Sequence, residues 1–114
     1  MRKNDLVRLH HILDAAQEAI GFAQGRKRSD LESDRMLVLS LVKDIEIIGE
    51  AAYRSSESTR QQLPDIPWDD MIRMRHRLVH AYFDIDLDIL WRTVLDDLPM
   101  LATILGRVIS DEEP

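Results

Sequence analysis

The sequence predicts an all-α fold, an up-and-down bundle of four to five helices formed by one domain over residues 1–114. Four segments carry apolar residues at alternating steps of three and four, the spacing of a single helix face. The connections between these segments are short, and we find no convincing alternation of apolar and polar residues of the kind that a half-buried strand requires. At 114 residues the chain is long enough for one hydrophobic core and too short for two.

The first predicted helix covers residues 5–24. Gly25 should end it, because glycine adopts the left-handed backbone conformation that commonly terminates helices. Residues 26–28 then form a basic loop. The apolar stripe of this helix consists of Leu6, Leu9, Leu13, Ala16, Ile20 and Ala23.

The second predicted helix begins near residue 30 or residue 34 and runs to about residue 54. Ser29 followed by Glu32 has the form of a capping box. The apolar residues between positions 37 and 52 surround more than one face, so this helix should contact more neighbours than an ordinary surface helix, and a dimer interface is a natural use for the extra face. Gly49 suggests a close approach between helices. Glu50 is either a surface or capping carboxylate or a group that orients an arginine of an active site.

The third and last helices follow two clear start signals. Pro67 can occupy the first position of a helix, where a missing N–H does no harm, and Asp86 is a plausible cap for the last helix. Pro99 should kink the last helix or mark a first turn. The third helix should present Met71, Met74, Leu78 and Ala81 to the core. The last helix carries a seven-residue repeat of Leu87, Leu90, Val94, Leu98, Leu101, Leu105 and Val108.

Composition restricts the classes of function. The chain has no cysteine, which excludes disulfides and thiolate metal sites. Its longest apolar run is far too short to span a bilayer and no signal-peptide core follows the N-terminus, so we expect a cytoplasmic protein with no membrane contact. The formal net charge is −6. Any contact with RNA must therefore depend on a local basic patch, because neutralised phosphates supply most nonspecific affinity.

Residues 73–83 form the most distinctive stretch of the chain, since they contain three arginines, two histidines and a tyrosine. If the third helix continues through them, Arg75 and His80 lie about 140° apart around its axis and flank one face. His76 and His80, four residues apart, would then stack on one line.

The arrangement of Arg75, His80 and Tyr82 is an R-x4-H-x-Y motif, and it resembles that of HepT-like toxins in the HEPN superfamily of helical ribonucleases. A lone motif of this kind is a weak signal. Further blocks at residues 34–37, 46–52, 65–68 and 82–87 also resemble recurring blocks of that family, in the same order. The resemblance therefore covers nearly the whole chain.

The resemblance implies metal-independent cleavage of RNA without a cofactor. The 2′-hydroxyl of the RNA would be the nucleophile, His80 would move protons, and Arg75 would hold the phosphate, with His76 and Arg77 in support. The products would be a 2′,3′-cyclic phosphate and a 5′-hydroxyl. Family members pair as homodimers, so that two copies of the motif line one cleft.

The resemblance also implies a partner, an antitoxin of the minimal nucleotidyltransferase type. This partner would transfer AMP onto Tyr82 and so silence the toxin, because a phosphodiester near Arg75 would occupy the phosphate site.

Three alternatives remain open at the level of sequence. The arginines could form a solvated face with no catalytic role, or the chain could be a non-catalytic HEPN-type module that only binds a nucleotidyltransferase. His76 and His80 could also bind zinc, although a third ligand is missing. His76 itself departs from the family, which usually has a small polar residue after the motif arginine.

Overall fold

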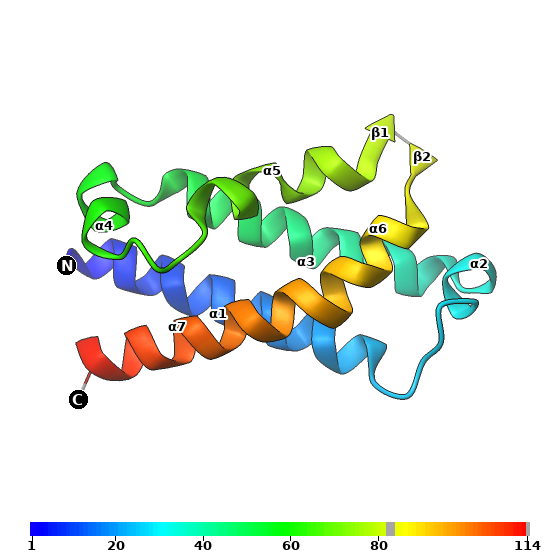
Figure 1. Ribbon diagram of the computed structural model, residues 1–114, viewed down its shortest axis with the longest axis horizontal. Helices are drawn as coiled ribbons and strands as arrows, with labels where there is room; N and C mark the ends of the chain where they lie inside the picture. Colours follow the sequence, from blue (N-terminus) through cyan, green and yellow to red (C-terminus); the bar gives the residue numbers. More distant parts are fainter. Residues whose placement is uncertain (82–83, 114) are drawn as a thin grey trace.

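The chain folds into an elongated helical bundle, which confirms the predicted all-α class (Figure 1). The structure is a computed structural model that describes residues 1–81 and 84–113, with only the backbone described at positions 80 and 81. The bundle measures 43 × 28 × 19 Å. Its elements are α1 (Lys3–Ala23), α2 (Asp30–Ser33), α3 (Arg35–Arg54), α4 (Glu57–Gln62), α5 (Trp68–Leu78), β1 (Val79–Ala81), β2 (Asp84–Ile85), α6 (Leu87–Arg92), the π-helical segment η1 (Thr93–Asp97) and α7 (Leu98–Glu112).

Helix α1 lies at the centre of the packing, against α3 on one side and α7 on the other (Figure 1). It buries Ala15, Ala16 and Ala19, whose small side chains let both neighbours approach. The narrow stripe predicted for this helix was partly wrong, because Ile12 is fully buried while Leu13 is only half-buried. A helix packed between two neighbours buries a broader face than a helix with one neighbour.

Helix α3 begins at the later of the two predicted positions. The Asp34 carboxylate caps it by accepting a hydrogen bond from the backbone N–H of Leu37 at 3.1 Å. The predicted capping box at Ser29 was wrong: that residue has a helical backbone conformation, and its side chain makes no capping hydrogen bond. A side-chain cap normally needs an extended backbone at the capping position.

Asp44 is a carboxyl group on the buried face of α3, with 1% of the residue exposed. Burial, followed by a hydrogen bond and charge repulsion from Glu18 of α1, raises the pKa of Asp44 to about 7. Among the described residues, its Oδ2 atom has no hydrogen-bond partner. The protonated form of Asp44 is therefore the one that suits this position.

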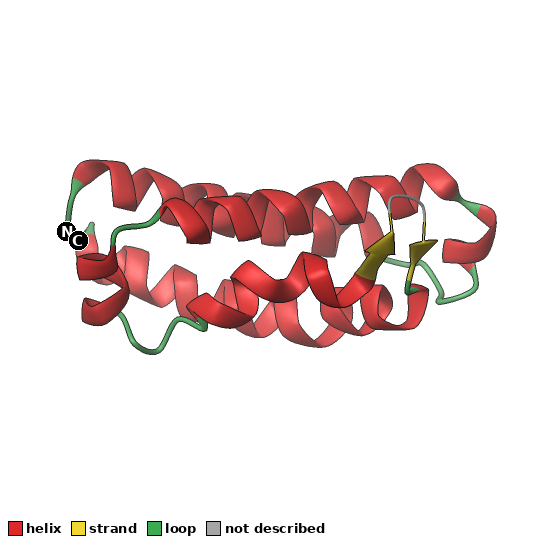
Figure 2. Cartoon of the chain, turned by 90° about the horizontal axis from the view of Figure 1, so that it is seen from above, coloured by secondary structure: helices red, strands yellow, loops and turns green. Residues whose placement is uncertain are grey.

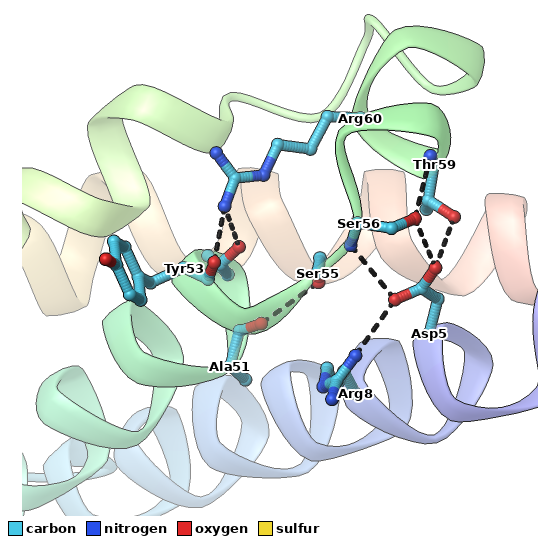
Figure 3. Close-up of polar contacts among 9 residues, drawn as sticks. Asp5, Arg8, Ala51, Tyr53, Ser55, Ser56, Thr59 and Arg60 are labelled. Carbon is cyan, nitrogen blue, oxygen red and sulfur yellow. Dashed lines mark hydrogen bonds and ion pairs between the residues drawn. The ribbon is translucent and has the colours of Figure 1, made fainter.

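Asp5 joins the start of α1 to the corner between α3 and α4 (Figure 3). Its carboxylate accepts hydrogen bonds from the Ser56 backbone N–H (3.1 Å), the Ser56 hydroxyl (2.6 Å), the Thr59 hydroxyl (2.7 Å) and the Arg8 guanidinium (3.1 Å). Burial alone would raise the pKa of Asp5, but these hydrogen bonds outweigh it and lower the pKa to about 2. A contact between the N-terminus of α1 and the C-terminal end of α3 also shows that these helices are antiparallel.

The segment after α5 is a short β-ribbon and not the predicted continuation of the helix (Figure 2). Strands β1 and β2 are antiparallel, with Val79 opposite Ile85. The helix ends at Leu78 because Val79 has an extended backbone and the carbonyl of Leu78 accepts a hydrogen bond from the Asp86 N–H at 2.7 Å. Position 81 is therefore in a strand, whereas Met71, Met74 and Leu78 are buried as predicted.

The last helical segment follows the predicted start signals. The Asp86 carboxylate accepts a hydrogen bond from the Ile89 N–H at 3.0 Å, which confirms it as the cap of α6. Pro99 lies in the first turn of α7, directly after η1, so the missing N–H of the proline coincides with a change of helical form. Within the described ranges, no helix is both long and apolar enough to cross a bilayer.

Candidate active site

A groove of about 870 Å³ runs between α1, α3 and α5. Each helix contributes residues spaced by three or four positions, which is the spacing of one helix face. The groove is lined by Asn4, Val7, Arg8 and His11 of α1, by Lys43, Glu46, Ile47, Gly49, Glu50, Ala51, Tyr53 and Arg54 of α3, and by Ile72, Arg75 and His76 of α5.

Gly49 brings α3 and α5 together beside this groove. A Cβ atom at this position would lie 3.2 Å from the backbone oxygen of Met71 and 3.7 Å from that of Ile72. The first distance is shorter than ordinary van der Waals contact, so a side chain would push α5 away from α3. The close approach predicted for Gly49 is confirmed, and it sets the distance between Glu46 on α3 and Arg75 on α5.

Arg75 projects from the last turn of α5 and is held by a carboxylate from α3. Its Nε–H donates a hydrogen bond to Oε1 of Glu46 at 3.0 Å. The side chains of Arg75 and Glu46 are 46% and 36% exposed, so the ion pair itself adds little to stability. Within the described part of the chain, no hydrogen bond joins the two terminal nitrogens of Arg75 to protein atoms. These two nitrogens form the edge of the guanidinium that binds phosphate oxygens in pairs.

The two residues that follow Arg75 differ in position. His76 is exposed and lines the groove beside Arg75. Arg77 does not line the groove, because one of its terminal nitrogens donates to the backbone oxygen of Asp70 at 3.0 Å and lies 3.4 Å from the Asp70 carboxylate. Of the two residues predicted to support the site, the structure thus brings only His76 next to Arg75.

The backbone of His80 lies in β1, two residues beyond the end of α5. The predicted separation of 140° around one helix axis was therefore wrong. The zinc alternative required His76 and His80 one turn apart on a single helix, and this arrangement is not formed. Tyr82, the predicted site of AMP transfer, lies outside the described residues.

Comparison with known families gives a match over most of the chain. The sequence profile described as "Ribonuclease HepT-like" matches residues 12–108. The chain belongs to this family. The family predicted from the motif and the ordered blocks is therefore confirmed.

Several known proteins are similar to this chain over most of its length. The HepT-like chain is 34% identical over 101 residues to a protein of Thermococcus cleftensis named "Probable ribonuclease HepT", covering 89% of this chain and 92% of that protein. It is 32% identical over 93 residues to a protein of Methanocaldococcus jannaschii named provisionally as an RNase, covering 82% and 85% of the two chains. A protein of Caldanaerobacter subterraneus with a similar provisional name is 30% identical over 105 residues, covering 92% and 94%. No solved structure matches the chain.

Glu46 is the residue of this HepT-like site that the sequence did not reveal. Glu50 was one candidate for the group that orients an arginine, but it pairs with Arg54 of its own helix at 2.6 Å. Glu46 and Glu50 are four residues apart and lie on the same face of α3, so helical periodicity cannot show which of them contacts Arg75. Only the position of α5 along α3 decides which glutamate meets Arg75.

Proposed function

We propose that this HepT-like chain is a metal-independent ribonuclease that acts as the toxin of a toxin–antitoxin module. The observation that carries this proposal is Arg75 at the groove, held through Nε by Glu46 with its terminal nitrogens directed to no protein partner in the described part of the chain. The names of the relatives, which describe ribonucleases, support the same reaction class.

In the proposed mechanism the two terminal nitrogens of Arg75 bind the non-bridging oxygens of the scissile phosphate. The RNA 2′-hydroxyl attacks the phosphorus and loses its proton, while the bond to the 5′-oxygen of the next nucleotide breaks and that oxygen gains a proton. His80 carries these protons, since imidazole has a pKa near neutrality. The products are a 2′,3′-cyclic phosphate and a 5′-hydroxyl. Arg75 offsets the charge that develops on the phosphate in the transition state.

Glu46 is a positioning residue in this mechanism. An arginine on a helix surface samples many rotamers, and ordering it at the moment of reaction costs free energy. The hydrogen bond from Nε to Glu46 fixes the plane of the guanidinium before RNA arrives. His76 lines the groove beside Arg75 and is a second candidate for phosphate binding or proton transfer. Arg77 supports the site only indirectly in this proposal, through its contacts with Asp70 on the same helix.

The experiment that tests the reaction compares three purified variants on single-stranded RNA. We expect His80→Ala and Arg75→Ala to abolish cleavage and growth inhibition, with circular dichroism unchanged. Arg73→Ala is the matched control, because Arg73 is exposed on the same helix and does not line the groove. Cleavage should persist in EDTA. Full activity of His80→Ala, or loss of activity with EDTA, contradicts this mechanism, and partner binding without any cleavage supports the non-catalytic module instead.

Silencing by a nucleotidyltransferase antitoxin is the second part of the proposal, with Tyr82 as the acceptor of AMP. Incubation with the antitoxin and ATP should add AMP to Tyr82 and stop cleavage, and Tyr82→Phe should stay toxic and escape silencing. Tyr53 is the internal control, because its side chain is accessible, with 67% of the residue exposed. AMP on Tyr53, or silencing of Tyr82→Phe by the enzyme, overturns this part and leaves the ribonuclease proposal intact.

We also propose that the active form is a homodimer. Met36 and Leu39 are exposed on α3 outside the lining of the groove, and they give this helix the surplus apolar face that the sequence indicated. A second copy on this face would bring two grooves together. Light scattering should report twice the monomer mass at micromolar concentration, and a monomer at high concentration contradicts the shared cleft.

A further inference from the structure

Lys43 of α3 and His11 of α1 line the groove and have no role in the mechanism above. We propose that they form a subsite that binds the single-stranded RNA on the two sides of the scissile phosphate, with Lys43 on a neighbouring phosphate. This inference rests on the proposed ribonuclease function, since it extends the same groove away from Arg75.

The positions of these residues follow from helix geometry. Lys43 precedes Glu46 by three residues, so it lies about one turn, or roughly 5 Å, along the same face of α3 from the carboxylate that holds Arg75. His11 lines the groove from α1, which packs against α3 along its length. An RNA strand with one phosphate on Arg75 can therefore place its next phosphate near Lys43.

The charge of the groove favours an anionic ligand. Arg8, Lys43, Arg54 and Arg75 line it together with Glu46 and Glu50, so four cations meet two carboxylates in a chain whose net charge is −6. Three of the cations already have carboxylate partners, since Arg8 pairs with Asp5, Arg54 with Glu50 and Arg75 with Glu46. Lys43 is exposed and forms no ion pair or hydrogen bond with any described residue, so its charge is available to a phosphate.

The apolar part of the groove favours a single strand. Val7 and Ile47 are partly exposed in the lining of the groove, and Ile72 is half-buried in the same lining. Such side chains contact the faces of bases and the riboses. A single strand exposes the base faces, whereas a duplex buries them in the base stack. Arg26 and Arg28, which belong to the other basic segment of the chain, both pair with carboxylates: Arg26 with Asp30 and Asp34, Arg28 with Glu32 and Asp88.

The test measures binding apart from cleavage. The probe is a fluorescent single-stranded 2′-O-methyl RNA oligonucleotide of mixed sequence, in which the nucleophile is blocked. Fluorescence anisotropy at several salt concentrations compares the wild type with Lys43→Glu and with the matched control Lys27→Glu, which makes the same charge change in the basic loop. We expect Lys43→Glu to raise Kd roughly tenfold and to reduce the salt slope by about 0.7, the value for one lost single-strand phosphate contact. His11→Ala should raise Kd by a smaller factor, and Lys27→Glu should leave it unchanged.

The outcomes separate this proposal from the ribonuclease proposal. A wild type that binds the probe through Lys43 but cleaves no RNA retains the subsite and removes the reaction. A wild type that cleaves RNA while Lys43→Glu binds normally, or while both charge reversals weaken binding equally, overturns the subsite and retains the reaction. Failure of the wild type to bind the probe at low salt, with an acidic peptide bound through Lys43 instead, overturns the subsite and identifies the groove as a site for a protein.

Discussion

Replacement of Asp5 by asparagine should weaken the junction between α1 and the α3–α4 corner. In the folded protein, hydrogen bonds from Ser56, Thr59 and Arg8 overcome the effect of burial and lower the pKa of Asp5 from 3.8 to about 2. That difference corresponds to about 2 kcal/mol of folding free energy at neutral pH. Asparagine keeps the size of the side chain, but it has no charge and directs an N–H group toward hydroxyl and amide donors.

Urea denaturation of the wild type and Asp5→Asn at several pH values measures this effect. At pH 7 we expect the midpoint of the variant to fall by about 1 M. Because the folded-state pKa of Asp5 is depressed, the advantage of the wild type is complete above about pH 4 and is lost as the pH falls from 3.8 through about 2. Asp14→Asn is the control, since Asp14 is exposed on the same helix. Equal midpoints at pH 7, or an advantage of the wild type that persists unchanged below pH 2, would refute the reasoning.

Three further predictions concern α3. Asp44→Asn should stabilise the protein by on the order of 4 kcal/mol at pH 8 and by less than half of that at pH 5. The raised pKa of Asp44 gives the wild type stability that is fully present below pH 3.8 and is lost progressively as the pH rises to about 7, and urea titrations at both pH values measure the difference. Gly49→Val should destabilise the protein by about 2 kcal/mol in thermal unfolding because its side chain meets the α5 backbone. Gly106→Val is the control: a Cβ atom there meets no atom within 4 Å, so this variant should be as stable as the wild type or slightly more stable, because valine favours a helix more than glycine does. Glu46→Gln should lower kcat roughly tenfold with little change in KM and in the midpoint of thermal unfolding. If the midpoint falls together with kcat, the role of Glu46 is purely structural.

The fold was predictable because helix periodicity and end signals depend on neighbours in sequence. The cap at Asp86 and the helix start at Pro67 are local effects of this kind. The cap is found in the structure, and the helix starts one residue later than predicted, at Trp68, with Pro67 in the capping position. The predicted cap at Ser29 failed because the backbone of Ser29 is helical, and the long helix α3 begins five residues later with Asp34 as its cap. Both residue types favour helix starts, so sequence alone offers two positions.

Of the residues predicted for the candidate site, Arg75 and His76 line the groove, but the geometry around them was not predictable. The motif identifies Arg75, but the end of α5 at Leu78 depends on the hydrogen bond between the Leu78 carbonyl and the returning strand. That contact is not visible in helical periodicity, which alone would extend the helix through position 81. The partner of Arg75 depends on how far α5 slides along α3, and Gly49 fixes this distance through a contact between backbones.

The β-ribbon after α5 has a consequence for how the site could evolve or be engineered. Arg75 is fixed by α3 through Glu46, whereas the backbone at position 80 is fixed by strand pairing between Val79 and Ile85. The residue proposed to anchor the phosphate and the residue proposed to carry the proton are therefore held in place by different parts of the fold. A change in the ribbon could retune one without disturbing the other, so the two functions can be altered independently within a chain of 114 residues.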